Sequence, residues 1–152
     1  MSAAADPGRS RPPHASASTV LLVVAGGIAG TLLRALVDVL IPQAGGLPWP
    51  TLAVNLTGAF ALGLLFEALS APRLGRAGAR LRLALGTGLI GSYTTYSALA
   101  VETTLLLGAG RIAEAIGYAA VTLVAGGALS FAGIVAGGAL RRRSEKREGP
   151  DA

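Results

Sequence analysis

The sequence alternates between long apolar runs and short polar or turn-forming segments. Four such runs cover residues 19–41, 51–69, 81–107 and 112–140. Each reaches the roughly 20 residues that an α-helix needs to cross a hydrocarbon core about 30 Å thick. Backbone groups in lipid must be hydrogen-bonded internally, so helices are expected rather than open strands. The pattern predicts an all-α membrane protein with four transmembrane helices, the last two forming an antiparallel hairpin.

The polar segments divide the chain into three parts. Residues 1–18 are rich in Ala, Ser, Pro and Arg, which predicts a disordered N-terminal tail. Residues 19–140 form the predicted transmembrane domain, and residues 141–152 form a basic C-terminal tail. Three more apolar runs follow the first, and no convincing cleavage site ends it. We therefore interpret the first run as a retained helix rather than a signal peptide.

Composition agrees with a membrane protein and narrows the possible chemistry. Apolar residues make up 52% of the chain and charged residues 14%, as is typical of helical membrane proteins. The chain has no Cys, and its only His, His14, lies in the N-terminal tail. These features argue against thiol chemistry and a His-centred site. Paired carboxylates, a phosphate-binding loop and a nucleophile motif are also missing from the sequence, so an enzyme is not expected.

The basic residues gather in regions that four spans would place on one side of the membrane. The other side has Arg111 and, near a helix end, Arg34. The positive-inside rule then predicts cytoplasmic termini. The net charge of +5 is interpreted as topological, and nucleic acid is not an expected partner. The clustered residues are Arg9 and Arg11, then Arg73, Arg76, Arg80 and Arg82, and finally Arg141, Arg142, Arg143, Lys146 and Arg147.

Polar and small residues occupy defined faces of the first two predicted helices. Gly26, Gly30 and Arg34 recur at a spacing of four, and small residues at that spacing allow close helix packing. Arg34 either snorkels to the membrane surface or attracts anions at the mouth of an aqueous vestibule. Asn55 lies well inside the second run, where its amide either bonds to a neighbouring helix or lines a polar path.

The last run carries a narrow face of small and hydroxyl residues. This face predicts either close packing or a polar track across the membrane. Its members, at spacings of three and four, are Tyr118, Thr122, Gly126, Ser130, Gly133 and Gly137.

The third run contains the sequence GSYTTYS at 91–97, which is unusually polar for a membrane helix. At about 100° per residue, the hydroxyls of Ser92, Thr94, Thr95 and Ser97 would point in all directions from a continuous helix. Together with nearby glycines, they predict a helix buried among partners and broken near its centre. A break frees backbone groups that bind a hard cation through carbonyls or a small anion through N–H groups.

These segments resemble the fluoride channels known as Fluc or CrcB. The resemblance covers residues 26–138, and its motifs occur in the family's order. The matching stretches are GGIAGTLLR at 26–34, NLTGAF at 55–60 and GTGLIGSYTTYSALAVE at 86–102.

The resemblance implies subunits that pair antiparallel in a bacterial plasma membrane and let fluoride leave the cytoplasm passively. A structural sodium ion would lie at the dimer centre, held by the main-chain carbonyls of Gly91 and Thr94. Arg34 would lie in the vestibule, and lipid would surround the dimer. The implied anion pathway passes Asn55, Thr95, Tyr96, Ser97, Tyr118 and Thr122.

Two departures from the family pattern favour a more specific hypothesis. Tyr96 and Leu99 stand where the family usually has two Phe residues, and Ala100 replaces the following Ser. The strong charge bias also disfavours insertion in both orientations. We therefore weigh a homodimer against a heterodimer with an oppositely oriented homologue. A proton-coupled small multidrug-type transporter and a non-conducting subunit are the alternative functions. Arg34 argues against the transporter, because proton-coupled export of cations normally requires a carboxylate within the first span.

Overall fold

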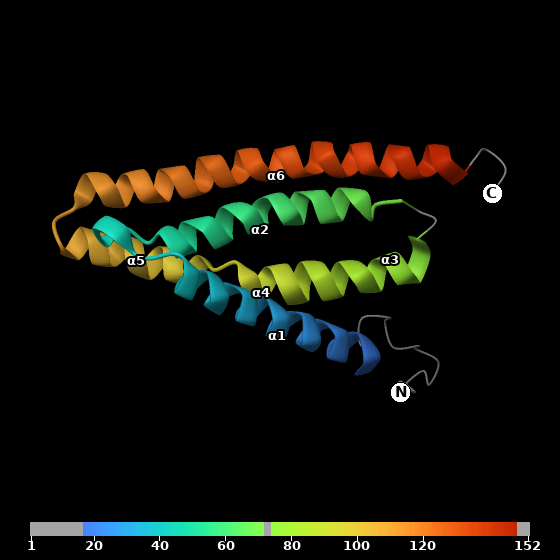
Figure 1. Ribbon diagram of the computed structural model, residues 1–152, viewed down its shortest axis with the longest axis horizontal. Coiled ribbons are helices and arrows are strands. Elements are labelled where there is room, and N and C mark those ends of the chain that lie inside the picture. The colour runs from blue at the N-terminus through green and yellow to red at the C-terminus, as the bar shows by residue number, and fades with distance from the viewer. Residues whose placement is uncertain (1–16, 72–73, 149–152) are drawn as a thin grey trace, which may run out of the picture.

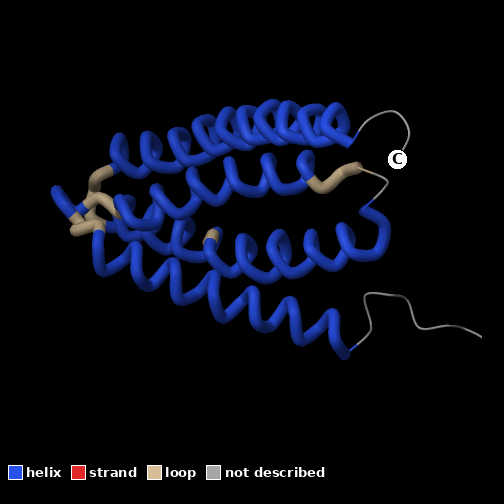
Figure 2. The backbone as a smooth tube through the Cα atoms, turned by 45° about the vertical axis from the view of Figure 1, so that its right-hand side comes forward, coloured by secondary structure: helices blue, strands red, loops and turns tan. Residues whose placement is uncertain are grey.

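The computed structural model describes residues 17–71 and 74–148, and it forms an elongated helical bundle (Figure 1). No strand occurs within these residues, and the tube in Figure 2 passes through helices and short connections only. The all-α prediction is therefore confirmed. In chain order the elements are α1 (Ala17–Leu40), η2 (Ala44–Gly46), α2 (Trp49–Ala68), α3 (Gly75–Arg82), η4 (Leu83–Ile90), α4 (Gly91–Tyr93), α5 (Tyr96–Gly108) and α6 (Ile112–Glu148).

Three helices of the described chain are long and apolar enough to cross a membrane. They are α1, α2 and the stretch Ile112–Ser144 of α6. The third predicted run is divided among α3, the π-helical η4, α4 and α5, so the predicted count of four spans stays a prediction. At 1.5 Å per residue, the 37 residues of α6 extend about 55 Å, well beyond a hydrocarbon core of about 30 Å.

The helix ends differ in detail from the predicted boundaries. Helix α1 begins at Ala17, inside the segment predicted as the N-terminal tail, whose first 16 residues lie outside the described chain. Helix α6 continues to Glu148, through most of the segment predicted as the basic tail. Helix α2 begins with Trp49 and Pro50, where proline's fixed φ and missing N–H suit a first turn.

Glycines bring α2 and α6 into close contact. A side chain at Gly63 would overlap the carbonyl oxygen of Ser130, and one at Gly133 would overlap that of Phe60. Gly137 lies similarly close to the Leu64 carbonyl. This part of the small-residue face on α6 therefore serves helix packing, because only glycine lets the two backbones approach so closely.

Helix α1 packs in the same way against η4. A Cβ atom at Gly26 would overlap the carbonyl oxygen of Ala84, and one at Gly30 would overlap that of Leu89. In return, Gly88 of η4 lies against the backbone of Val23. The small residues predicted for close packing on the first helix do pack closely, and they hold α1 beside the segment that contains α4 (Figure 1).

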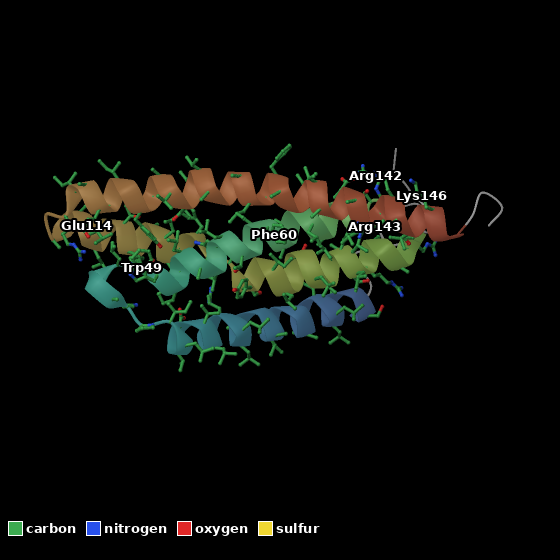
Figure 3. The ribbon with its side chains drawn as sticks, turned by 45° about the horizontal axis from the view of Figure 1, so that its top comes forward. Trp49, Phe60, Glu114, Arg142, Arg143 and Lys146 are labelled. Carbon is green, nitrogen blue, oxygen red and sulfur yellow. The ribbon has the colours of Figure 1, made fainter. Side chains whose placement is uncertain are left out.

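The two ends of the bundle have different chemistry. At one end, Arg111 donates to the carbonyls of Gly45 and Gly46 at 2.7 and 3.0 Å and forms an ion pair with Glu114. Both glycines have positive φ angles, 66° and 67°, which cost other residues steric strain. Trp49 and Glu114 mark this end, whereas Arg142, Arg143 and Lys146 mark the other (Figure 3).

Candidate functional site

The centre of the candidate site is an interruption between α4 and α5. Helix α4 ends at Tyr93 and α5 begins at Tyr96. Thr94 and Thr95 between them have extended backbones, with φ/ψ of −78°/158° and −149°/117°. Figure 2 shows this point as a short loop within an otherwise helical path. The backbone therefore leaves the helix inside the polar stretch GSYTTYS.

Asn55 of α2 binds both backbone groups of Thr95. Its amide nitrogen donates to the Thr95 carbonyl at 3.0 Å, and its amide oxygen accepts from the Thr95 N–H at 2.8 Å. A residue outside a helix needs other partners for both backbone groups, and one amide side chain supplies them here. The cross-helix bond that the sequence left as one of two alternatives for Asn55 is therefore present.

The interruption diverts two N–H groups from their helical acceptors. In a continuous helix, Thr95 and Ala98 would donate to the carbonyls of Gly91 and Thr94, four residues earlier. Instead, the Thr95 N–H donates to Asn55, and the Ala98 N–H donates to the Thr95 hydroxyl at 3.2 Å. The Gly91 and Thr94 carbonyls thus lose these donors, and carbonyl oxygens suit a hard cation. The donor chemistry of the predicted metal residues fits such an ion.

A second polar cluster joins α2, α5 and α6 around Glu102. Its carboxylate accepts from the hydroxyls of Thr51 and Tyr118, both at 2.7 Å. Thr51 and Tyr118 are buried, with 6% and 7% of their surface exposed. Thr122 lies one turn beyond Tyr118 and donates to its carbonyl at 2.8 Å. Glu102 ends the third stretch that resembles the family, 86–102. The sequence did not predict that it binds Thr51 and Tyr118.

A cavity of ≈ 570 Å³ brings several predicted residues together. Its lining includes Arg34, Thr95 and Ser97 of the predicted set. Asp38, Thr51 and Glu102 also line it, so one space holds a cation, carboxylates and hydroxyls. The Thr95 and Ser97 hydroxyls lie 3.2 Å apart. Arg34 therefore shares a cavity with the hydroxyls of the interruption, an arrangement that fits the vestibule alternative.

A smaller cavity of ≈ 410 Å³ lies next along the bundle and shares Glu102 with the first. Arg111 lines this second space. Each cavity therefore has one arginine in its lining, and the Glu102 carboxylate borders both.

Other predicted residues lie apart from the cavities. Tyr96 is 81% exposed and turns away from the interior of the chain. Leu99 is buried at 8% exposure, in a core with Leu106, Ala115 and Tyr118. Leu99 stands where the family resemblance leads us to expect a Phe ring, and its side chain packs in this core instead. The roles of Asn55, Tyr96 and the other pathway residues stay predictions.

The apolar helices, close glycine packing and internal polar contacts define a helical integral membrane protein. Its particular family follows from comparison with known proteins: the chain belongs to the CrcB-like family (CrcB-like protein, Camphor Resistance), whose model matches residues 21–134. This family consists of ion channels rather than enzymes.

Named relatives agree with this assignment over most of their length. The chain is 42% identical over 133 residues to "Fluoride-specific ion channel FluC 2" of Leifsonia xyli subsp. xyli, covering 86% of this chain and 91% of that protein. It is 41% identical over 123 residues to "Fluoride-specific ion channel FluC" of Thermus thermophilus, covering 79% and 95%. The similarity thus includes all the elements that form the site.

Proposed function

We propose that the chain is a subunit of a fluoride-specific channel that lets fluoride leave the cytoplasm passively. The observation that carries this proposal is about 40% identity to proteins named fluoride-specific ion channels, over most of each chain. The polar cavities and buried hydroxyls support it independently, because an anion crossing lipid needs donors along its way. The sequence has no nucleotide motif that would couple transport to ATP.

In this proposal the chain crosses a bacterial plasma membrane four times. Helices α1, α2 and α6 are three spans, and the segments from α3 to α5 together form the third span in chain order, broken at its centre. The exposed arginines of α3 and the end of α6 support cytoplasmic termini. These residues include Arg76, Arg80, Arg142 and Arg143.

Two such subunits would pair in opposite orientations, with the interruptions meeting at the centre. The carbonyls of Gly91 and Thr94 would hold a structural sodium ion there, joined by equivalent groups of the second subunit. The bound ion would supply positive charge that holds these carbonyl dipoles together. The diverted N–H groups of Thr95 and Ala98 support this assignment, because they no longer donate to these two carbonyls.

Fluoride would cross along neutral donors. Arg34 attracts the anion into the larger cavity, where Thr95 and Ser97 offer hydroxyls. Asn55 fixes that wall, and the ring edge of Tyr96 offers a weak positive surface. Farther on, Glu102 holds Thr51 and Tyr118 in place beside the pathway, and Thr122 follows on α6. Weak successive sites of this kind allow an ion to leave as readily as it enters.

We also propose that the partner is an oppositely oriented homologue rather than a second copy. The cationic residues of the described chain are concentrated in α3 and the C-terminal part of α6. These two segments lie at the same end of the bundle (Figure 1), and such a bias fixes orientation. Relatives with numbered names, such as "FluC 1" of Cutibacterium acnes and "FluC 2" of Leifsonia xyli subsp. xyli, fit organisms with more than one such protein.

Fluoride efflux from liposomes tests the function and the pairing together. The chain is reconstituted alone and with a homologue from the same genome, and a fluoride electrode records efflux, with chloride as the control anion. Efflux only with the homologue supports the heterodimer. Strong efflux from the chain alone, with subunits in both orientations, contradicts it. Proton-coupled cation flux would indicate a transporter instead, and no flux in either sample would indicate a non-conducting subunit.

A Glu102→Gln substitution tests the Glu102 cluster. Thr51 and Tyr118 donate to different oxygens of the Glu102 carboxylate. Gln replaces one of these oxygens with an NH2 group that only donates, so one of the two hydroxyls loses its acceptor. A hydrogen bond to a charged group contributes about 1.5–3 kcal/mol. We therefore expect efflux to fall about tenfold or more. Equal or faster efflux from the folded variant would remove the carboxylate from the organisation of the pathway.

A further inference from the structure

Three consecutive residues at the interruption each contact the same turn of α2. The Tyr93 hydroxyl lies 2.9 Å from the Thr57 hydroxyl. The Thr94 methyl group lies against Gly58, where any side chain would overlap it. Thr95 is held by Asn55 through both backbone groups. The turn 55–58 therefore contacts each residue from the end of α4 to the start of α5.

The hydrogen-bond direction between Tyr93 and Thr57 follows from the other contacts of Thr57. The Thr57 hydroxyl has one proton, and it donates this proton to the carbonyl of Ala53 at 2.7 Å. The Tyr93 hydroxyl must then be the donor in the pair. The result is a short chain of bonds from Tyr93 through Thr57 to the α2 backbone, in which each bond polarises the next.

This pair and Asn55 hold opposite sides of the interruption. Asn55 fixes Thr95, the last extended residue before α5, whereas Thr57 fixes Tyr93, the last residue of α4. The Tyr93 ring also lies beside Gly58, with its Cδ1 atom 3.4 Å from the position of a Cβ there. Thr94 is thus fixed from both neighbours, and so is the direction of its carbonyl.

We propose that Tyr93 and Thr57 form a positioning pair that sets the Thr94 carbonyl for cation binding at the interruption. This inference rests on the proposed function, because it assumes that the Thr94 carbonyl binds sodium. Neither side chain contacts the cation; they act through the backbone. Without the pair, the end of α4 rotates more freely about Thr94, and sodium has to restrict that rotation on binding.

The test compares Tyr93→Phe, Thr57→Val and the double variant, each in the complete channel. Each single substitution removes one hydroxyl and keeps the side chain's size. Thr104→Val is the matched control, because among the described residues the Thr104 hydroxyl bonds only to a carbonyl of its own helix, that of Ala100. The measurements are the sodium concentration for half-maximal efflux and, independently of flux, hydrogen exchange of the Thr94 and Thr95 amides by NMR.

We expect each single variant and the double variant to raise the half-maximal sodium concentration about threefold, as is typical for one interhelical hydrogen bond in a membrane. Maximal efflux returns at high sodium, and Thr94 exchanges about threefold faster. A purely structural contact would lower maximal efflux without shifting the sodium dependence, and that result would overturn the proposal.

The two readouts separate this inference from the proposed function. If the unmodified channel conducts but the variants keep its sodium dependence, the positioning role is wrong. If the unmodified protein does not conduct, the proposed function is wrong. The exchange rate of the Thr94 amide then tests the positioning pair by itself. Faster exchange of Thr94 in both single variants then supports the pair, and unchanged exchange overturns it.

Discussion

Gly30→Ala is expected to prevent α1 from closing on η4 and to abolish fluoride efflux. The added methyl group would overlap the Leu89 carbonyl and would also lie 3.1 Å from the Tyr93 nitrogen. Both neighbours are backbone atoms close to the interruption, so no side chain can rotate away to make room. Overpacking typically costs about 1–3 kcal/mol. We expect the upper end of that range, a large part of a total stability of about 5–15 kcal/mol.

The same chemical change at Gly127 is the matched control. Apart from the neighbouring backbone of α6 itself, no described atom lies within 4 Å of a Cβ at this position. Ala is favoured over Gly in a helix interior by about 0.5–1 kcal/mol, so Gly127→Ala should keep or slightly raise stability. Thermal unfolding in detergent and efflux from liposomes measure both variants. Equal unfolding temperatures for the two would show that the approach of α1 to η4 is not needed.

The sequence predicts the long apolar helices closely because hydropathy depends on each segment alone. The first two runs, at 19–41 and 51–69, agree within two residues with α1 (Ala17–Leu40) and α2 (Trp49–Ala68). The glycine faces were also predictable, since spacings of three and four place residues on one side of a helix. The face on α6 divides in a way that the spacing did not indicate. Gly133 and Gly137 pack against α2, whereas Tyr118 bonds to Glu102.

The Glu102 cluster could not be predicted because it depends on how three helices meet. Thr51 and Glu102 are 51 residues apart in sequence, and Tyr118 is 16 residues beyond Glu102. No motif joins these positions, and the acidic residues of the four apolar runs, Asp38, Glu67, Glu102 and Glu114, are far apart in sequence. The available signal was the carboxylate of Glu102 inside a predicted span, because such a group needs a partner in the membrane. Thr51 in the preceding span and Tyr118 in the following span were possible partners.

Leu99 shows the limit of reading single motif positions. Sequence comparison marks it as a missing ring beside the anion path, whereas the structure places it in the core with Leu106, Ala115 and Tyr118. Its side chain therefore supports the helix that carries Glu102. Arg111 is similar: it was counted only as one charge on the less basic side, yet its guanidinium donates to the carbonyls of Gly45 and Gly46.

Asn55→Leu is expected to reduce fluoride efflux by about thirtyfold or more while the helical fold persists. Leu has nearly the size of Asn but neither donates nor accepts, so it leaves the Thr95 N–H and carbonyl without their present partners. Each unsatisfied group costs about 1–3 kcal/mol, and two such losses correspond to at least thirtyfold in an equilibrium. The backbone at Thr95 would rearrange to recover these bonds, which moves the hydroxyls of Thr95 and Ser97 in the larger cavity.

The expected loss comes from the interruption rather than from α2 as a whole, and the measurements are chosen to show this. Circular dichroism and size-exclusion chromatography should match the unmodified channel, whereas exchange of the Thr95 amide should accelerate. Val124→Ala on α6 is the control for a substitution away from the interruption, because Val124 is 73% exposed. Undiminished efflux from a folded Asn55→Leu variant would mean that Thr95 keeps its conformation without Asn55. The cavity wall would then depend on the contacts of Tyr93 and Thr94 with α2.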